Sequence, residues 1–141
     1  MFAILDTNHL RELVSHTSAL GRRLRDRIKG SRAEVFAGIV VVEESMQGWM
    51  ALLNRRAAGP AQVNVYQQMQ ESLEAAVKLG VLPFDHDAAT IFVALRRSFR
   101  RIGTMDLKIA AICLAHDVTL LTRNVGHFKD IPGLRVENWL D

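Results

Sequence analysis

The sequence predicts an α/β fold in which helices cover both faces of a central, mainly parallel sheet. Short apolar segments alternate along the chain with amphipathic stretches, as in sheets whose strands are joined by helices. The first segment, Phe2–Leu5, is apolar throughout, as a strand buried on both faces requires. With 141 residues and 49% hydrophobic content, the chain can bury a sizeable core. We therefore expect one domain over residues 1–141, with right-handed connections between its strands.

The first half of the chain carries apolar residues at helical spacing between two predicted strands. Asp6, Thr7 or Asn8 can cap the first helix, and Gly59-Pro60 ends the last one of this half. In chain order, the elements are a strand at Phe2–Leu5, a helix through Leu10 and Val14, a helix from Leu20 to Ile28, a strand from Glu34 to Val40 and a helix from Glu44 to Leu53.

The second half continues the same alternation. Gly80 is placed to stop the helix before it, and Asp85 or Asp87 can cap the next one. The expected elements are a helix at 61–79, a short extended piece at 81–84, a helix through Ala88 and Phe99, a helix from Thr104 to Ala115, and strands at 118–121 and 134–139. Because the helix from Thr104 is nearly apolar all round, we expect it at the centre of the fold.

Composition limits the class of protein. The longest apolar runs, such as Ile39–Val42, are far shorter than the roughly 20 residues that cross a bilayer. Met1 is followed by apolar residues without a basic leader, so we expect no signal peptide. The single Cys113 excludes an internal disulfide and fits a reducing compartment, so the expected location is the cytoplasm, without a membrane partner.

The net charge is only +3, but the basic residues gather in groups. These groups are Arg22–Arg32, Arg55–Arg56 and Arg96–Arg101. They could hold the phosphates of a polyanion around an acidic centre, whereas any single group is equally explained as the solvated face of a helix. Only their combination with the acidic residues favours nucleic acid.

Acidic and amide side chains follow the apolar segments at places where parallel strands would end. The candidates are Asp6, Glu44, with which the neighbouring Glu43 competes, Asp106, and Asn124 beside Thr122. Because the carboxyl ends of parallel strands meet in one crevice, these side chains can converge on a divalent cation, which indicates metal-dependent phosphodiester chemistry. Each alone has a plainer explanation: a helix cap for Asp6, a surface position for Glu44, the helix dipole for Asp106 and a turn for Asn124.

Other chemistries are disfavoured. The histidines contain no H-x-x-x-H pair, so a zinc enzyme is not expected. The chain also lacks G-x-x-x-x-G-K-[ST] and G-x-G-x-x-G, the usual nucleotide-binding loops. Cys113 lies in an apolar helix and is expected to pack in the core. Core packing is likewise expected for the aromatic residues Trp49, Phe92, Phe99 and Trp139.

Four segments together resemble one family. They are L-D-T-N, V-E-E-S-M-Q-G-W, I-G-T-M-D-L-K-I-A-A-I-C-L-A-H and L-L-T-R-N-V-G-H-F-K-D-I-P-G-L-R-V-E-N-W, in that order over nearly the whole chain. They are similar to the PIN-domain ribonucleases, specifically the VapC-type toxins of bacterial toxin–antitoxin systems. The resemblance implies a PIN-like three-layer α/β/α sandwich and a Mg²⁺- or Mn²⁺-dependent endoribonuclease. It further implies that Asp6 and Asp106 are the principal metal ligands, Glu44 a third acidic member and Asn124 an assisting residue.

The resemblance also implies partners: an RNA substrate, a cognate antitoxin whose segment blocks the acidic pocket, and a second copy of the chain in a homodimer. One position departs from the pattern, because His127 stands where many members carry an acidic residue before Phe128. An imidazole cannot supply that negative charge, so one-metal catalysis is the expectation. A catalytically degenerate PIN module that binds RNA or a protein stays open as an alternative, and a metal-binding phosphatase as a remoter one.

Overall fold

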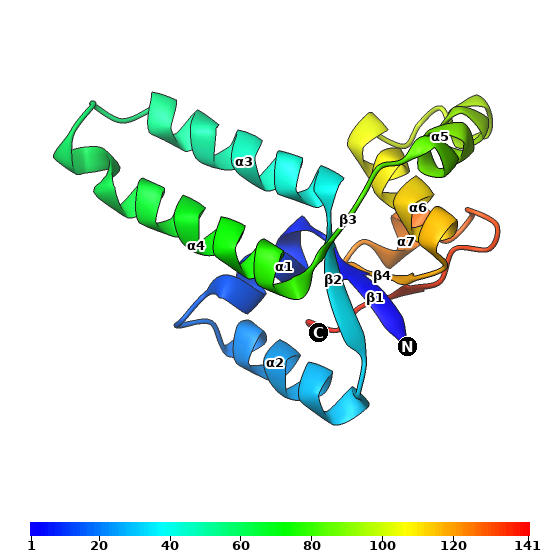
Figure 1. Cartoon of the computed structure of the whole chain (residues 1–141), viewed down its shortest axis with the longest axis horizontal. Helices are drawn as coiled ribbons and strands as arrows, with labels where there is room; N and C mark the ends of the chain where they lie inside the picture. Colours follow the sequence, from blue (N-terminus) through cyan, green and yellow to red (C-terminus); the bar gives the residue numbers. More distant parts are fainter.

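A five-stranded parallel sheet forms the centre of the molecule (Figure 1), in a computed structural model that describes residues 1–141. The strand order is β3-β2-β1-β4-β5, and every neighbouring pair is parallel. The strands are β1 (Phe2–Leu5), β2 (Glu34–Gly38), β3 (Val81–Leu82), β4 (Thr119–Leu121) and β5 (Val136–Glu137). The predicted α/β class is confirmed, with a sheet that is parallel throughout.

Helices cover the sheet on both faces. They are α1 (Thr7–Val14), α2 (Ala19–Ser31), α3 (Ile39–Asn54), α4 (Val63–Leu79), α5 (His86–Ser98), α6 (Thr104–His116) and the short α7 (Val125–Phe128). Figure 1 shows α1, α2 and α4 on one side of the sheet and α5 and α6 on the other, while α3 and α4 project together as an antiparallel pair. None of the helices has the length and apolar character needed to cross a bilayer.

Two strand boundaries differ from the prediction. β2 ends at Gly38 rather than at Val40, and α3 begins at Ile39 without any side-chain cap. The β-branched run favours a strand locally, but Val40 and Val41 reach the core from the first turn of the helix, and this burial outweighs the local propensity. The predicted strand at 134–139 pairs only at Val136–Glu137.

The core lies between β1, β4 and α6. Ile4 and Leu5 are fully buried, and so are Ala110 and Ile112 on the central helix. Cys113 is buried beside them, and loss of hydration raises the pKa of its thiol to about 12. The central position expected for α6 and the packing role expected for Cys113 are both confirmed.

Several arginines of the basic groups make contacts within the chain. Arg25 donates to the carbonyl of Leu13 at 2.8 Å, at the end of α1. Arg96 donates to the carbonyl of Ile102 at 3.0 Å and to the Thr104 hydroxyl at 3.1 Å, so it braces the loop that leads into α6. These two side chains therefore support the fold, whereas Arg97, Arg100 and Arg101 are exposed.

The strand register brings the site together. Leu5 pairs with Leu121 in the parallel ladder, and the Asp6 amide donates to the Leu121 carbonyl at 2.9 Å. Asp6 and Thr122 therefore leave the sheet side by side at the carboxyl ends of β1 and β4.

Candidate metal centre

An acidic cavity of about 260 Å³ opens at the carboxyl ends of the strands. Each predicted site residue lies on its wall: Asp6, Glu44, Asp106 and Asn124. They come from the β1–α1 junction, α3, α6 and the β4–α7 connection, so four separate segments contribute. The arrangement brings the three carboxylates and the side-chain amide of Asn124 to one opening, which Asn8 also lines.

Asp6 is fixed by the helix that it caps. It adopts an extended backbone conformation, and its Oδ1 atom accepts the His9 amide at 2.8 Å. The same oxygen lies 3.1 Å from Nδ1 of the His9 imidazole. Oδ2 makes no hydrogen bond within the chain and is the oxygen left for a ligand.

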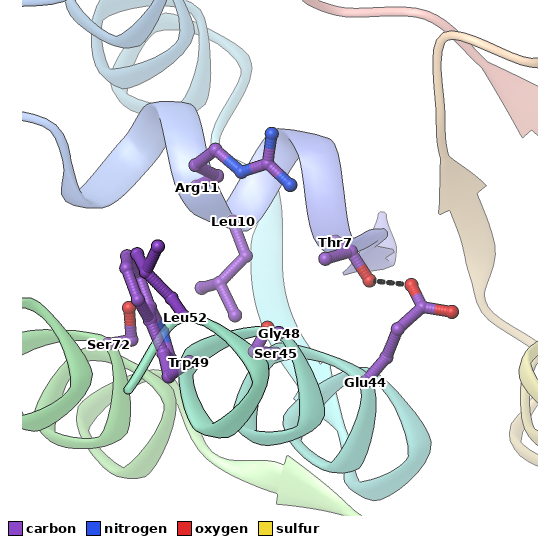
Figure 2. Close-up of a pocket in the computed structure, with 9 residues that line it drawn as sticks. All are labelled: Thr7, Leu10, Arg11, Glu44, Ser45, Gly48, Trp49, Leu52 and Ser72. Carbon is purple, nitrogen blue, oxygen red and sulfur yellow. Dashed lines mark hydrogen bonds between the residues drawn. The ribbon is translucent and has the colours of Figure 1, made fainter. Parts of the chain in front are cut away.

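Glu44 reaches the cavity from the second turn of α3. Its Oε1 atom accepts a hydrogen bond from the Thr7 hydroxyl, as Figure 2 shows. A second hollow of about 190 Å³ adjoins the first and shares Thr7, Arg11 and Glu44 with it. Gly48 lies one turn beyond Glu44 on the same wall, as the spacing predicts, and a Cβ atom there would meet open space.

Trp49 also lines this second hollow, between α1 and α4. Core packing was expected for it from its spacing, but it is only half-buried and lies outside the central cluster. Trp139, in contrast, is 5% exposed and belongs to the core as expected. The spacing predicts that Trp49 faces inward, but the projecting α3–α4 pair leaves that face partly uncovered.

Asp106 stands in the first turn of α6 and contacts His127. Its Oδ2 atom lies 3.1 Å from His127 Nε2, with the two side chains 38% and 34% exposed, respectively. The residue that replaces the expected acid is thus in direct contact with a predicted metal ligand.

Thr122 and Asn124 form the turn after β4. Thr122 is buried, and its hydroxyl accepts the Asn124 amide at 3.1 Å. The turn thus depends on the threonine, while the Asn124 side chain lines the cavity without a hydrogen-bond partner in the chain. Its amide is available to a ligand.

The donor set fits a hydrated Mg²⁺ or Mn²⁺ ion. No three His, Cys, Asp or Glu side chains are already gathered around one point as a closed ligand set. Thr7 engages Glu44 and His127 engages Asp106, which holds those carboxylates toward the walls. Mg²⁺ usually keeps several waters and takes one or two carboxylates, so an open cavity with three carboxylates suits it better than a tight cage.

Sequence reasoning missed three side chains at this site: Thr7, His9 and Arg11. Arg11 is exposed, is the one basic residue on the cavity wall, and makes no hydrogen bond or ion pair. Thr7 and Arg11 are four residues apart on α1 and so share a face. The sequence shows this spacing, but only the packing of α1 against α3 shows that the shared face of Thr7 and Arg11 lines the cavity.

Comparison with known proteins gives a consistent picture. The model of the family described as "PIN domain" matches residues 3–134. Ribonuclease VapC2 of Rickettsia felis is 33% identical over 78 residues, which cover 52% of this chain and 58% of that protein. The alignment thus spans little more than half of the curated relative.

Solved structures share the fold over almost the full length. VapBC2 from Rickettsia felis bound to a DNA fragment from its promoter superposes with a TM-score of 0.75, at 22% identity and 99% coverage of both chains. A toxin–antitoxin complex from Klebsiella pneumoniae gives a TM-score of 0.67 at 25% identity, with 97% of both chains covered. At such identities the likeness concerns the fold, and the three-layer PIN-like architecture predicted from the sequence is confirmed.

Proposed function

Because the chain belongs to the PIN-domain family, we propose that it is a metal-dependent endoribonuclease that acts as the VapC-type toxin of a toxin–antitoxin pair. The observation that carries the proposal is the convergence of Asp6, Glu44 and Asp106 on one cavity. The curated relative is named a ribonuclease, which supports the same activity.

In this proposal Asp6 and Asp106 would hold Mg²⁺ or Mn²⁺, and Glu44 would contribute directly or through a water. When bound, the cation would neutralise charge at the phosphate and lower the pKa of the attacking water. Asn124 orients a ligand in the pocket through its unpaired amide. Arg11, on the same wall, is placed to contact a phosphate of the RNA and so to offset the repulsion between polyanion and carboxylates.

The RNA backbone is proposed to continue over the adjacent basic surface. A hollow of about 580 Å³ beside the site is lined by Arg97, Arg100 and Arg101, together with His127, which contacts Asp106. Exposed guanidinium groups in such a hollow can follow the phosphates of a single strand. The basic group that the sequence singled out thus divides into Arg96, which braces the loop, and the exposed arginines, which are available to RNA.

An antitoxin segment is proposed to occupy the groove that leads into the acidic cavity. Three hollows follow one another from that cavity along α1 and α4. The first and second share Arg11, Trp49 and Ser72, and the second and third share His16. A segment that carries an apolar side chain and a basic side chain would place the first against Trp49 and the second against the carboxylates.

A second copy of the chain is proposed to pack on the projecting pair α3 and α4. Apolar side chains are exposed on this pair and support the proposed homodimer: Met50, Tyr66, Leu73 and Val77.

Cleavage of a mixed pool of structured RNAs tests the proposal. Purified, antitoxin-free protein is assayed with Mg²⁺, with Mn²⁺ and with EDTA, beside Asp6→Asn and Asp106→Asn. Asparagine caps helices as well as aspartate does, so Asp6→Asn removes the charge without removing the cap. Asp26→Asn is the matched control, because Asp26 is an exposed aspartate on α2 away from the cavity.

We expect metal-dependent cutting by the wild type and Asp26→Asn, and cutting at the EDTA background for the two cavity variants. Metal binding without cleavage of any RNA would favour the alternative of a catalytically degenerate module that binds RNA or a protein. The contacts of Thr7 with Glu44 and of His127 with Asp106 support that alternative. Absence of metal binding overturns the catalytic assignment.

A further inference from the structure

His9 is a fully buried histidine on α1, one turn after Asp6. Both of its ring nitrogens are engaged. Nδ1 lies 3.1 Å from Oδ1 of Asp6, and Nε2 lies 3.2 Å from the backbone nitrogen of Trp139. The imidazole therefore connects the first carboxylate of the cavity to a segment 130 residues away in the sequence.

The contact with Trp139 determines the tautomer. A backbone N–H can only donate, so Nε2 of His9 must be the acceptor and carries no proton. In the neutral ring the proton is then on Nδ1, which donates it to the Asp6 carboxylate. Two hydrogen bonds at opposite ends of the ring thus fix both its orientation and its protonation pattern.

The contacts with His9 give the two carboxylate oxygens of Asp6 different roles. Oδ1 accepts both the backbone amide and the imidazole N–H of His9, whereas Oδ2 accepts nothing from the chain. With Oδ1 held twice, the carboxylate cannot rotate without losing two hydrogen bonds, and Oδ2 stays available at the cavity.

The far end of this connection is itself held firmly. Trp139 and Leu140 are 5% and 1% exposed. The guanidinium of Arg27 lies 4.8 Å from the centre of the Trp139 ring, and Arg23 donates to the Leu140 carbonyl at 3.3 Å. Residues of the first basic group therefore secure the segment that orients His9.

We propose that His9 is a positioning residue that holds Asp6 in the orientation that binds a divalent cation and ties that orientation to the placement of Trp139. This inference rests on the proposed metal-dependent function. Partners that orient metal ligands in this way typically change metal affinity by about 10–100-fold when they are removed.

Two substitutions separate the two ends of the ring. In His9→Asn the side-chain amide can stand in for Nδ1–H toward Asp6 but does not reach Trp139. In His9→Gln the side-chain oxygen can accept the Trp139 N–H, while the donor to Asp6 is lost. A merely structural role predicts that metal affinity follows the melting temperature in both variants alike.

Binding of Mn²⁺ to RNA-free protein is measured by calorimetry, with the melting temperature recorded for each variant in EDTA. We expect His9→Asn to bind Mn²⁺ nearly as the wild type does, and His9→Gln to bind it about 10–100-fold more weakly. Equal losses in the two variants, or no loss in His9→Gln, overturn the inference.

A spectrum of the wild-type protein keeps the inference testable if a variant fails to fold. Long-range ¹H–¹⁵N correlation of the His9 ring should show the proton on Nδ1 and a bare Nε2, and the opposite tautomer overturns the proposed contact. Asp6→Asn distinguishes the two levels of failure. If it leaves Mn²⁺ binding unchanged, the metal-site proposal fails; if it abolishes binding while His9→Gln does not weaken it, only the role of His9 fails.

Discussion

Replacing His127 by aspartate should lower the stability of the metal-free protein and raise its affinity for the metal. In the wild type, His127 Nε2 lies 3.1 Å from Asp106 Oδ2. The substitution removes this contact and places a second carboxylate at a distance of about 5 Å, where repulsion is about 1 kcal/mol in a water-like medium and about 3 kcal/mol at an effective dielectric of about 20. Both side chains are about one-third exposed, so the lower value applies.

Loss of the exposed contact between the His127 imidazole and Asp106 adds up to about 1 kcal/mol, so His127→Asp should be less stable than the wild type by about 1–2 kcal/mol in EDTA. For a domain of about this size each kcal/mol shifts the melting temperature by about 2–4 °C. His127→Asn is the matched control, since it removes the imidazole without adding charge, and it should lose only the part that comes from this contact.

Magnesium should reverse the order of the two variants. The added carboxylate is a hard oxygen ligand beside Asp106, and tenfold tighter binding contributes about 1.4 kcal/mol once Mg²⁺ is in excess. Thermal unfolding followed by circular dichroism in EDTA and over a Mg²⁺ series measures both effects. The reasoning is refuted if His127→Asp has the same melting temperature as the wild type in EDTA. It is also refuted if Mg²⁺ raises the melting temperature of His127→Asp no more than that of His127→Asn.

Three further outcomes are expected. Because burial raises the pKa of the Cys113 thiol to about 12, iodoacetamide at pH 8 should leave native protein unmodified and alkylate it fully in guanidinium, as mass spectrometry will report. Arg100→Ser with Arg101→Ser should raise KM for RNA with little change in kcat and should flatten the salt dependence, as cleavage kinetics at several salt concentrations will show. The hydrogen bond from Arg123 holds the pKa of Asp141 at about 2, below the ordinary 3.8. This depressed pKa means that the pair stabilises the fold above about pH 4 and ceases to do so as pH falls toward 2. An NMR titration should find the Asp141 midpoint near 2 and a higher midpoint in Arg123→Gln, where the hydrogen bond from Asn138 still lowers the pKa of Asp141.

The fold could be predicted because each strand is a short apolar run and the apolar residues of each helix recur every three or four residues. The register of a parallel sheet then brings Asp6 and Thr122 together without further information. The boundary between β2 and α3 at Gly38 could not be predicted from the sequence. Val40 and Val41 favour a strand by themselves and become helical only through burial against the core. Local propensity and tertiary packing disagree there, and packing prevails.

Asp6, Glu44, Asp106 and Asn124 could be placed from the sequence because strand ends and helix starts locate them on one edge of the sheet. Their neighbours could not, since a contact such as that of His9 with Trp139 joins residues 130 positions apart and leaves no periodic trace. Thr7 and His127 are likewise ordinary residues in the sequence, and only the packed structure shows that they touch Glu44 and Asp106.

These neighbours limit the cost of gathering three carboxylates at one cavity. Carboxylates around one cavity repel one another and lose hydration, and both effects oppose folding. In this chain each carboxylate has a partner of its own: Thr7 for Glu44, His9 for Asp6 and His127 for Asp106. These partners offset part of that cost, and each contacts only one oxygen of its carboxylate, so the other oxygen stays available to a ligand. Asp6 differs from the other two because the His9 amide and the His9 imidazole both hold its Oδ1 atom. Of the three proposed metal ligands, Asp6 is therefore the one whose orientation is fixed by two contacts.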